Sequence, residues 1–419
     1  MKTIFVFLLM VGRLFAQPFE ILPSGVTNFL FDVHFVNAST GYVALNNGSY
    51  LKTSNSGVSW NEFSSGSPKF ITSFFFINED KGFAVGESGR VFKTTNSGLN
   101  WQISSPAEQT LRNIYFLDFL NGYAVGDFST VIKTTNGGES WFNQIVSSGD
   151  ALFTDVMFVD GKGYITVATS LTNLFVSTNN GINWTDGKIR GGSIHSKAID
   201  FHAQSGYFAG YEIVPGTYHP LIFKTSNNGE TWNEYIIESR GQLYDIAVSP
   251  IDPNKACAVG QYVDDLMYGN KALIMRTING GETWTEEPWG VNGDEFKGVD
   301  ATSNDFFIVG RNGVILKTSH SVGIFPINNE IPLGYFLSQN FPNPFNPSTK
   351  INFSIPKSGK VKLSVFNMVG KEVVVLLDQS LSAGNYTADF DASNLTSGVY
   401  FYTLQSENFT ETKRMVLVK

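Results

Sequence analysis

Short apolar runs recur at regular spacing over most of the chain. In one copy, residues 73–76 form a short apolar run that suits a buried innermost strand. A Lys-Gly turn leads to a second apolar run at residues 83–86, as in a hairpin. After a short loop, residues 90–94 alternate apolar and polar side chains, as a half-buried strand does. The pattern predicts three consecutive antiparallel strands in each repeat.

Each repeat continues into a box with the pattern Thr/Ser-x-Asn-x-Gly-x-x-Trp. The Asn side chain is expected to hydrogen-bond the backbone two residues on, and the Gly to supply a positive φ. This tight turn returns the chain so that the Trp begins an outer fourth strand, where its indole packs between neighbouring blades. We interpret the box as structural rather than as a ligand site. Its six copies end at Trp60, Trp101, Trp141, Trp184, Trp232 and Trp284.

The spacing of the boxes predicts the architecture. Intervals of roughly 40–50 residues match one four-stranded propeller blade. A seventh repeat, residues 298–318, contains three strands but no box Trp. Residues 18–22 precede the first inner strand, with Phe19 where other repeats have Trp, and we expect them to close the ring by completing that blade. The sequence thus predicts an all-β fold with a seven-bladed β-propeller over residues 17–319.

The composition changes after Thr318. Residues 320–335 lack the repeat and are expected to form a linker, and three prolines within residues 340–347 exclude a helix there. Short alternating segments then predict a small Ig-like β-sandwich over residues 336–419. Its strands are expected at residues 350–355, 360–367, 371–377, 384–389, 398–405 and 411–418.

The propeller repeat is similar to known repeats. Its boxes resemble the BNR or Asp-box, with Asn in all six copies where the common form has Asp. The run Gly-Tyr-Ala-Val-Gly followed by Lys-Thr-Thr-Asn-Gly-Gly-x-x-Trp, within residues 122–141, resembles the photosystem II stability and assembly factor family, which is also seven-bladed. The resemblance covers residues 24–319 and implies the fold. It implies no activity, because the matching residues belong to the scaffold.

Four motifs characterise the C-terminal segment. They are Asn-Phe-Pro-Asn-Pro-Phe-Asn-Pro at 340–347, Val-Phe-Asn-Met-Val-Gly-Lys-Glu-Val at 365–373, Asp-Ala-Ser-Asn-Leu-Thr-Ser-Gly-Val-Tyr-Phe-Tyr at 391–402, and the terminal Lys-Arg-Met-Val-Leu-Val-Lys at 413–419. Together they closely resemble the C-terminal sorting domain of the type IX secretion system of Bacteroidota. The resemblance implies export by that machinery, removal of the domain by a sortase-like peptidase, and release or attachment to surface lipopolysaccharide. The alternative is a permanent accessory adhesion module.

The first residues of the chain are typical of a secretory signal. Lys2 precedes an apolar run at residues 4–11, and a small residue predicts cleavage between Ala16 and Gln17. No later stretch approaches the roughly 18 apolar residues of a membrane span. The single cysteine, Cys257, excludes an intrachain disulfide and is expected to be a buried, inert thiol. We therefore predict a secreted or cell-surface protein, with residues 1–16 as its signal peptide.

Composition excludes several functions. A formal net charge of −8 and a pI near 5.2 oppose attraction to nucleic acid or anionic membranes. The five His residues form no pair at metal-ligand spacing, and common catalytic and nucleotide-binding motifs are absent from the sequence. We expect a monomer without metal, cofactor or catalytic residues.

A glycoside hydrolase or sialidase is the alternative, because such enzymes share Asp-boxes. Sialidases need three converging arginines, but no arginine of this propeller lies in the Arg-Ile-Pro motif that usually marks the first. Xyloglucan hydrolases place paired carboxylates between two propellers, whereas this chain has one.

Blades 5 and 6 depart from the repeat between their second and third strands. This connection is short in blades 2, 3 and 7, as at residues 87–89, but spans 211–220 in blade 5 and 261–271 in blade 6. Insertions in repeat folds commonly lie on the binding face. We predict two neighbouring loops that form a recognition patch, or alternatively loops that cap each other. The candidate ligand-binding residues are Tyr211, Tyr218, Tyr262, Asp264, Asp265 and Tyr268.

Two further sites are weaker candidates. Asp264 and Asp265 have the chemistry of calcium ligands, although adjacent carboxylates are more often solvated. Arg90 and Arg311 follow or occupy short connections and could converge on an anion near the axis, or could be ordinary exposed arginines. The function predicted from the sequence is non-catalytic binding of protein or polysaccharide.

Overall fold

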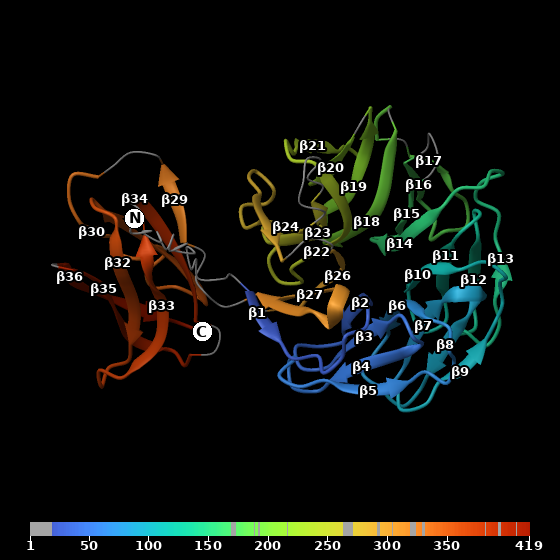
Figure 1. Cartoon of the computed structure of the whole chain (residues 1–419), viewed down its shortest axis with the longest axis horizontal. Helices are drawn as coiled ribbons and strands as arrows, with labels where there is room; N and C mark the ends of the chain where they lie inside the picture. Colours follow the sequence, from blue (N-terminus) through green and yellow to red (C-terminus); the bar gives the residue numbers. More distant parts are fainter. Residues whose placement is uncertain are drawn as a thin grey trace, which may run out of the picture. The chain divides into compact units, whose positions relative to one another are not determined.

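The computed structural model describes most of the chain (Figure 1). It has two compact units, Glu20–Lys317 and one that includes Thr318–Lys419. No helix in the described part of the chain is long and apolar enough to cross a membrane. The predicted signal peptide, with its Ala16–Gln17 cleavage site, lies outside the described residues. These are 19–168, 173–187, 189–191, 193–215, 217–262, 271–290, 294–303, 305–318, 324–328, 332–381, 383–392, 395–407 and 409–419.

The first unit contains seven four-stranded sheets whose inner strands surround a common axis (Figure 1). The first three are β2 (Leu30–Phe35), β3 (Gly41–Leu45), β4 (Ser49–Thr53), β5 (Asn61–Ser64); β6 (Ile71–Phe76), β7 (Gly82–Gly86), β8 (Val91–Thr94), β9 (Gln102–Ser104); and β10 (Leu111–Phe116), β11 (Gly122–Gly126), β12 (Val131–Thr134), β13 (Phe142–Asn143). The next three are β14 (Phe153–Val159), β15 (Lys162–Val167), β16 (Leu174–Ser177), β17 (Thr185–Asp186); β18 (Ile194–His202), β19 (Ser205–Val214), β20 (Thr217–Thr225), β21 (Asn233–Ile236); and β22 (Gly241–Val248), β23 (Ala256–Tyr262), β24 (Lys271–Thr277), β25 (Thr285–Trp289). The predicted seven-bladed propeller is confirmed.

The seventh sheet joins the two ends of the propeller sequence. It contains β26 (Phe296–Ala301), β27 (Phe306–Gly310) and β28 (Ile315–Thr318), and its outer strand is β1 (Phe19–Leu22). Leu22 is buried in the apolar core shared by the seventh and first blades, next to Trp60 and Ile315. The N-terminal strand therefore pairs an edge that would otherwise be open. Short 3₁₀ turns, η1 (Glu87–Gly89) and η2 (Arg311–Gly313), form the short connections of blades 2 and 7.

Aspartates on the inner strands link neighbouring blades. Asp32 accepts a hydrogen bond from the Phe74 backbone N–H of the next blade at 2.8 Å. The same arrangement recurs from Asp155 to Ile199 at 2.9 Å, Asp200 to Val248 at 2.7 Å, Asp245 to Val299 at 2.8 Å, and Asp300 to Phe35 at 2.5 Å. Burial raises the pKa of each carboxyl group, with Asp32 at about 8.

The box turns are held by a repeated hydrogen-bond pattern. In blade 3, Asn136 Oδ1 accepts from the Ser140 N–H at 3.0 Å, and Thr134 Oγ1 accepts from the Gly138 N–H at 3.0 Å. The Asn thus bonds the backbone four residues on, rather than two as predicted from its residue type, because the Thr hydroxyl accepts from the Asn N–H two residues on. Asn136 Nδ2 also donates to Ser140 Oγ at 2.9 Å, which a carboxylate in the common Asp-box could not do.

The box also joins adjacent blades. Tyr42 of the first blade donates its hydroxyl to the Ser97 carbonyl in the box of the second, at 2.8 Å. Trp101 packs edge-on against Tyr50 of the first blade, with ring centroids 6.0 Å apart. Each box therefore holds its own turn and the interface with the preceding blade.

Replacing Thr134 with Val is expected to destabilise the propeller by about 1–3 kcal/mol, because the Gly138 N–H would lose its buried acceptor. Thr134→Ser should cost less, since Ser177 makes the same bond at 2.8 Å in blade 4. Urea unfolding followed by tryptophan fluorescence measures both. Equal stability of the Val and Ser variants would contradict this role of the hydroxyl.

The second unit consists of two four-stranded sheets that share one apolar core. One sheet has the order β29 (Ile324–Asn328), β34 (Gly384–Asp391), β31 (Ser348–Ile355), β30 (Phe336–Leu337). The other has the order β33 (Glu372–Leu381), β32 (Gly359–Phe366), β35 (Gly398–Ser406), β36 (Phe409–Leu417). All six predicted strands are present, with bounds shifted by a few residues.

Part of the segment predicted as a linker is a strand. β29 pairs antiparallel with β34, with Ile324 opposite Ala388. Pro326 lies within β29, and a proline is tolerated there because β29 is at the edge of its sheet. The linker expected at residues 320–335 therefore contains an edge strand of the second unit.

Candidate ligand-binding face of the propeller

Every inner strand of the propeller has a β-bulge in its first half. The register against the second strand shifts by one residue in all seven blades, for example between Leu111 and Asn113. Because inner and second strands are antiparallel, the bulges lie at the same end of the blades as the connections between second and third strands. The bulged residues are Phe31, Thr72, Arg112, Thr154, Lys197, Tyr244 and Lys297.

Two of the three cations at the bulges are neutralised by carboxylates. Arg112 donates from Nε and Nη2 to the two oxygens of Asp127, at 2.7 and 2.9 Å. Lys297 Nζ lies 3.2 Å from Glu295 and 3.4 Å from the centroid of the Tyr244 ring. Both charges are thus matched within the protein.

Lys197 is the third cation and has a different environment. Its Nζ lies 5.6 Å from the centroid of the Tyr211 ring. Within the described residues, no carboxylate lies within ion-pairing distance of it. Burial, followed by the nearby charges of Lys297 and Arg112, lowers its pKa to about 8, while Asp127 acts in the opposite direction.

The predicted blade 5 loop is a hairpin. β19 and β20 continue past the blade, pairing Tyr211 with Pro220 and Val214 with Thr217, so residues 211–214 and 217–220 are strand rather than loop. The alternating Tyr-Glu-Ile-Val sequence extends the strand, and Pro220 is accommodated because β21 begins to pair with β20 only at Leu221.

The hairpin brings two of the predicted tyrosines together. The Tyr211 and Tyr218 rings meet edge to face, with centroids 5.5 Å apart, and His195 stacks on Tyr211 at 5.0 Å. Tyr218 is 37% exposed and Ile213 is 43% exposed. Tyr244 of blade 6 is near enough to this pair for their charges to affect its pKa, although burial is the main cause of its increase. An aromatic surface therefore borders Lys197.

The other predicted residues have different positions. Tyr262, at the end of β23, packs against the apolar core between blades 5 and 6. Arg311 is held by Glu295, with Nε 3.0 Å from Oε1, and lies over the Phe29 ring. Arg90 follows η1 in blade 2, and the described contacts do not join it to Arg311. Asp264, Asp265 and Tyr268 lie outside the described residues, as does the calcium site proposed for the two aspartates.

Arg112, Lys197, Tyr244 and Lys297 were not predicted from the sequence. Each is the bulged residue of its inner strand, and aligning the seven repeats at this position would have shown three cations there. The chemical significance of this position depends on the bulge, which the alternation of side chains does not reveal.

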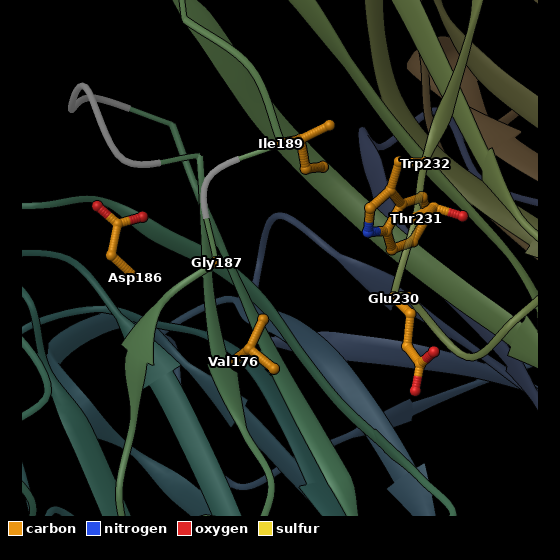
Figure 2. A pocket seen from close by; sticks show the side chains of 8 residues that line it. Val176, Asp186, Gly187, Ile189, Glu230, Thr231 and Trp232 are labelled. Carbon is orange, nitrogen blue, oxygen red and sulfur yellow. The ribbon is translucent and has the colours of Figure 1, made fainter.

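Apart from this face, a groove lies between the outer parts of blades 4 and 5 (Figure 2). Its volume is ≈ 580 Å³, and the side chains of Asp186, Glu230 and Trp232 line it. In blade 3, Gln144 donates to the carbonyl of Gly181 in the box of the next blade at 2.7 Å, whereas blade 4 has Gly187, which has no side chain, three residues after its box Trp. Among the described residues, no group of three His, Cys, Asp or Glu side chains could hold a metal ion.

Two family models match the chain. The secretion system C-terminal sorting domain matches residues 339–419, and the photosynthesis system II assembly factor YCF48 matches residues 99–253. No curated protein matches it.

Several solved structures share the fold. YCF48 bound to D1 peptide is 16% identical with a TM-score of 0.55, over 73% of this chain and 98% of that one. YCF48 from Cyanidioschyzon merolae is 18% identical with a TM-score of 0.55, over 72% and 98%. The Niastella koreensis GH74 enzyme is 12% identical with a TM-score of 0.55, over 96% and 75%. The propeller is a YCF48-like BNR domain, and the chain ends in a type IX secretion system sorting domain that directs export to the cell surface or the medium.

Proposed function

We propose that the exported propeller is a non-catalytic module that binds a peptide segment of another protein on the face formed by the inner-strand bulges and the blade 5 hairpin. The observation that carries this proposal is the exposed Tyr218 and Ile213 beside Lys197, a cation without a carboxylate partner in the described chain. Aromatic side chains supply rigid contact area at protein interfaces. The similar fold of YCF48 bound to D1 peptide is consistent with such a role.

The carboxylates of this face support binding rather than hydrolysis. A glycosidase needs a protonated acid with a raised pKa. Here Asp127, Glu212 and Glu295 each pair with an arginine, and the pKa of Glu212 is lowered by Arg190. The raised carboxyl pKa values belong to the inner-strand aspartates, which hold backbone N–H groups of the next blade.

A glycoside hydrolase is the alternative, and the groove between blades 4 and 5 gives it a specific location. Asp186 and Glu230 both line this groove, as does Trp232 (Figure 2). Glu230 lies 3.5 Å from Lys162 Nζ. Release of sugar from a polysaccharide, lost in Asp186→Asn or Glu230→Gln, would favour this alternative over peptide binding.

The full-length protein is expected to retain members of a peptide array, and Tyr218→Ala to weaken this retention about 5–30-fold, the equivalent of losing about 1–2 kcal/mol from an interface aromatic. Phe142→Ala is the matched control, because Phe142 is 50% exposed on the outer strand of blade 3. Unchanged retention by Tyr218→Ala would contradict the proposed face.

The sorting domain implies a second set of partners. Its family match means that the chain interacts with the secretion machinery during export. Removal of the domain by a sortase-like peptidase, and attachment of the mature protein to surface lipopolysaccharide, are proposals that extend this role. Comparing the mass of the exported protein with that of the full chain tests the cleavage.

A further inference from the structure

Among the residues that the structure describes, no carboxylate pairs with Lys197. Within that part of the chain, Asp127 is the carboxylate whose charge raises the pKa of Lys197, and both oxygens of Asp127 already accept from Arg112. Glu295 is likewise shared between Lys297 and Arg311. These two described carboxylates are thus engaged by other cations.

Lys197 is also half-buried. It is the bulged residue of β18, and its sequence neighbours Ser196 and Ala198 are buried. One side of its ammonium faces the Tyr211 ring. A partly buried ammonium loses hydration, and an anion that reaches it would restore a charge-assisted hydrogen bond.

We infer that Lys197 anchors one carboxylate of the bound peptide, either an Asp or Glu side chain or the chain-terminal carboxylate. This inference rests on the proposed peptide-binding function and names the chemistry of that site. The carboxylate contacts Lys197 Nζ while neighbouring apolar side chains of the peptide contact Tyr218 and Ile213, which are exposed on the adjacent hairpin.

The arrangement of charges favours a peptide over an acidic polysaccharide. A polyuronate carries a carboxylate on every sugar and needs a row of free cations. Here Arg112 and Lys297, the other two cations at the bulges, are already paired with Asp127 and Glu295. Lys197, the one cation at the described bulges without a described carboxylate partner, lies beside an aromatic surface, and this arrangement fits one acid flanked by apolar side chains.

The test uses the full-length protein and an array in which each peptide is present in an Asp/Glu form with a free C-terminus and in an Asn/Gln form with an amidated C-terminus. Single-site forms separate the side-chain acid from the terminal carboxylate. Wild type is expected to prefer acidic forms at least about tenfold, and Lys197→Met to lose this preference. Lys197→Arg should keep part of it.

Lys133→Met is the matched control, because Lys133 Nζ also lies over a tyrosine ring, 4.9 Å from the centroid of Tyr123, on the third strand of blade 3. It should keep the acidic preference. Tryptophan fluorescence on heating checks that each variant is folded, and the wild-type comparison of acidic and amide peptides needs no variant.

The outcomes separate the two proposals. Equal retention of acidic and amide peptides by wild type would overturn the role of Lys197 and leave peptide binding intact. A preference for acidic peptides that persists in Lys197→Met would have the same meaning. Failure of wild type to retain any peptide would overturn both. Retention of polygalacturonate but not of dextran or of any peptide would replace the peptide with an acidic polysaccharide and so also overturn the inference.

Discussion

The propeller is expected to lose about 2–4 kcal/mol of unfolding free energy between pH 6.5 and pH 8. Burial raises the pKa of Asp32 to about 8 and that of Asp200 to about 7, and it raises the pKa of Asp245 well above its usual range. In this window the folded protein therefore binds more protons than the unfolded chain, so stability falls as the pH rises. Each group changes stability by at most about 1.4 kcal/mol per pH unit.

Groups whose titration makes stability rise with pH change charge mainly outside the range from pH 6.5 to pH 8. Burial lowers the pKa of His34, so its contribution to stability is lost only as the pH falls below about 6.5. The lowered pKa of Lys197, about 8, makes stability rise only above that pH. Asp32 is partly exposed, so solvent screens its charge. The expected change in unfolding free energy is therefore smaller than the full pKa shift would give.

Asp32→Asn provides the sharpest version of this test. The amide oxygen can still accept from the Phe74 N–H, but the group no longer titrates. The variant should resemble wild type at pH 6.5 and be more stable at pH 8. All seven tryptophans lie in the propeller, so their fluorescence during urea unfolding reports on this unit. Asp118→Asn is the control, because the pKa of Asp118 is lowered and the group stays ionised throughout the window.

A pH profile that rises from 6.5 to 8 would contradict the assignment, as would an unchanged slope in Asp32→Asn. The result matters for the whole ring, because these aspartates connect the inner strand of one blade to that of the next.

The blades were predictable because each local pattern agrees with the fold. The second strand of blade 3, residues 122–126, is fully buried, and the third strand is buried except at the half-buried Lys133. The box supplies its own turn chemistry through hydrogen bonds within eight residues. Such local signals are visible in one sequence. By contrast, β29 has a proline at its centre and is held by pairing with β34, a partner about 60 residues further along the chain, and such pairing cannot be read from local pattern.

The candidate site was predictable only in part. Tyr211 and Tyr218 were identified because they lie in a connection longer than that of other repeats, although this connection was predicted as a loop where the structure has a hairpin. Lys197 was missed because strict alternation treats it as an ordinary strand position. The bulge shifts the register at this residue, and consecutive buried residues, Ala198 and Ile199, follow it. Its significance also depends on Asp127 being occupied by Arg112, a contact within another blade.

Shortening the two buried side chains of β1 is expected to open the ring. Phe19 is 4% exposed and Leu22 is 4% exposed, so Phe19→Ala should cost about 3–5 kcal/mol and Leu22→Ala about 2–5 kcal/mol. Leu22 contacts the core shared by the seventh and first blades, and its loss weakens the outer strand that covers β28. Ile21→Ala is the matched control on the same strand, because Ile21 is 63% exposed and its removal should change stability by less than about 0.5 kcal/mol.

The double variant Phe19→Ala/Leu22→Ala tests whether β1 is required to close the propeller. If the strand closes the ring, its loss exposes the edge of β28, whose Ile315 and Leu316 are buried, and the variant should unfold early in urea and self-associate. Tryptophan fluorescence and light scattering measure the two effects. A double variant as stable and as monomeric as Ile21→Ala would mean that six complete blades and a three-stranded seventh sheet suffice. The predicted signal cleavage after Ala16 leaves β1 intact, so the closure is expected to form in the exported protein.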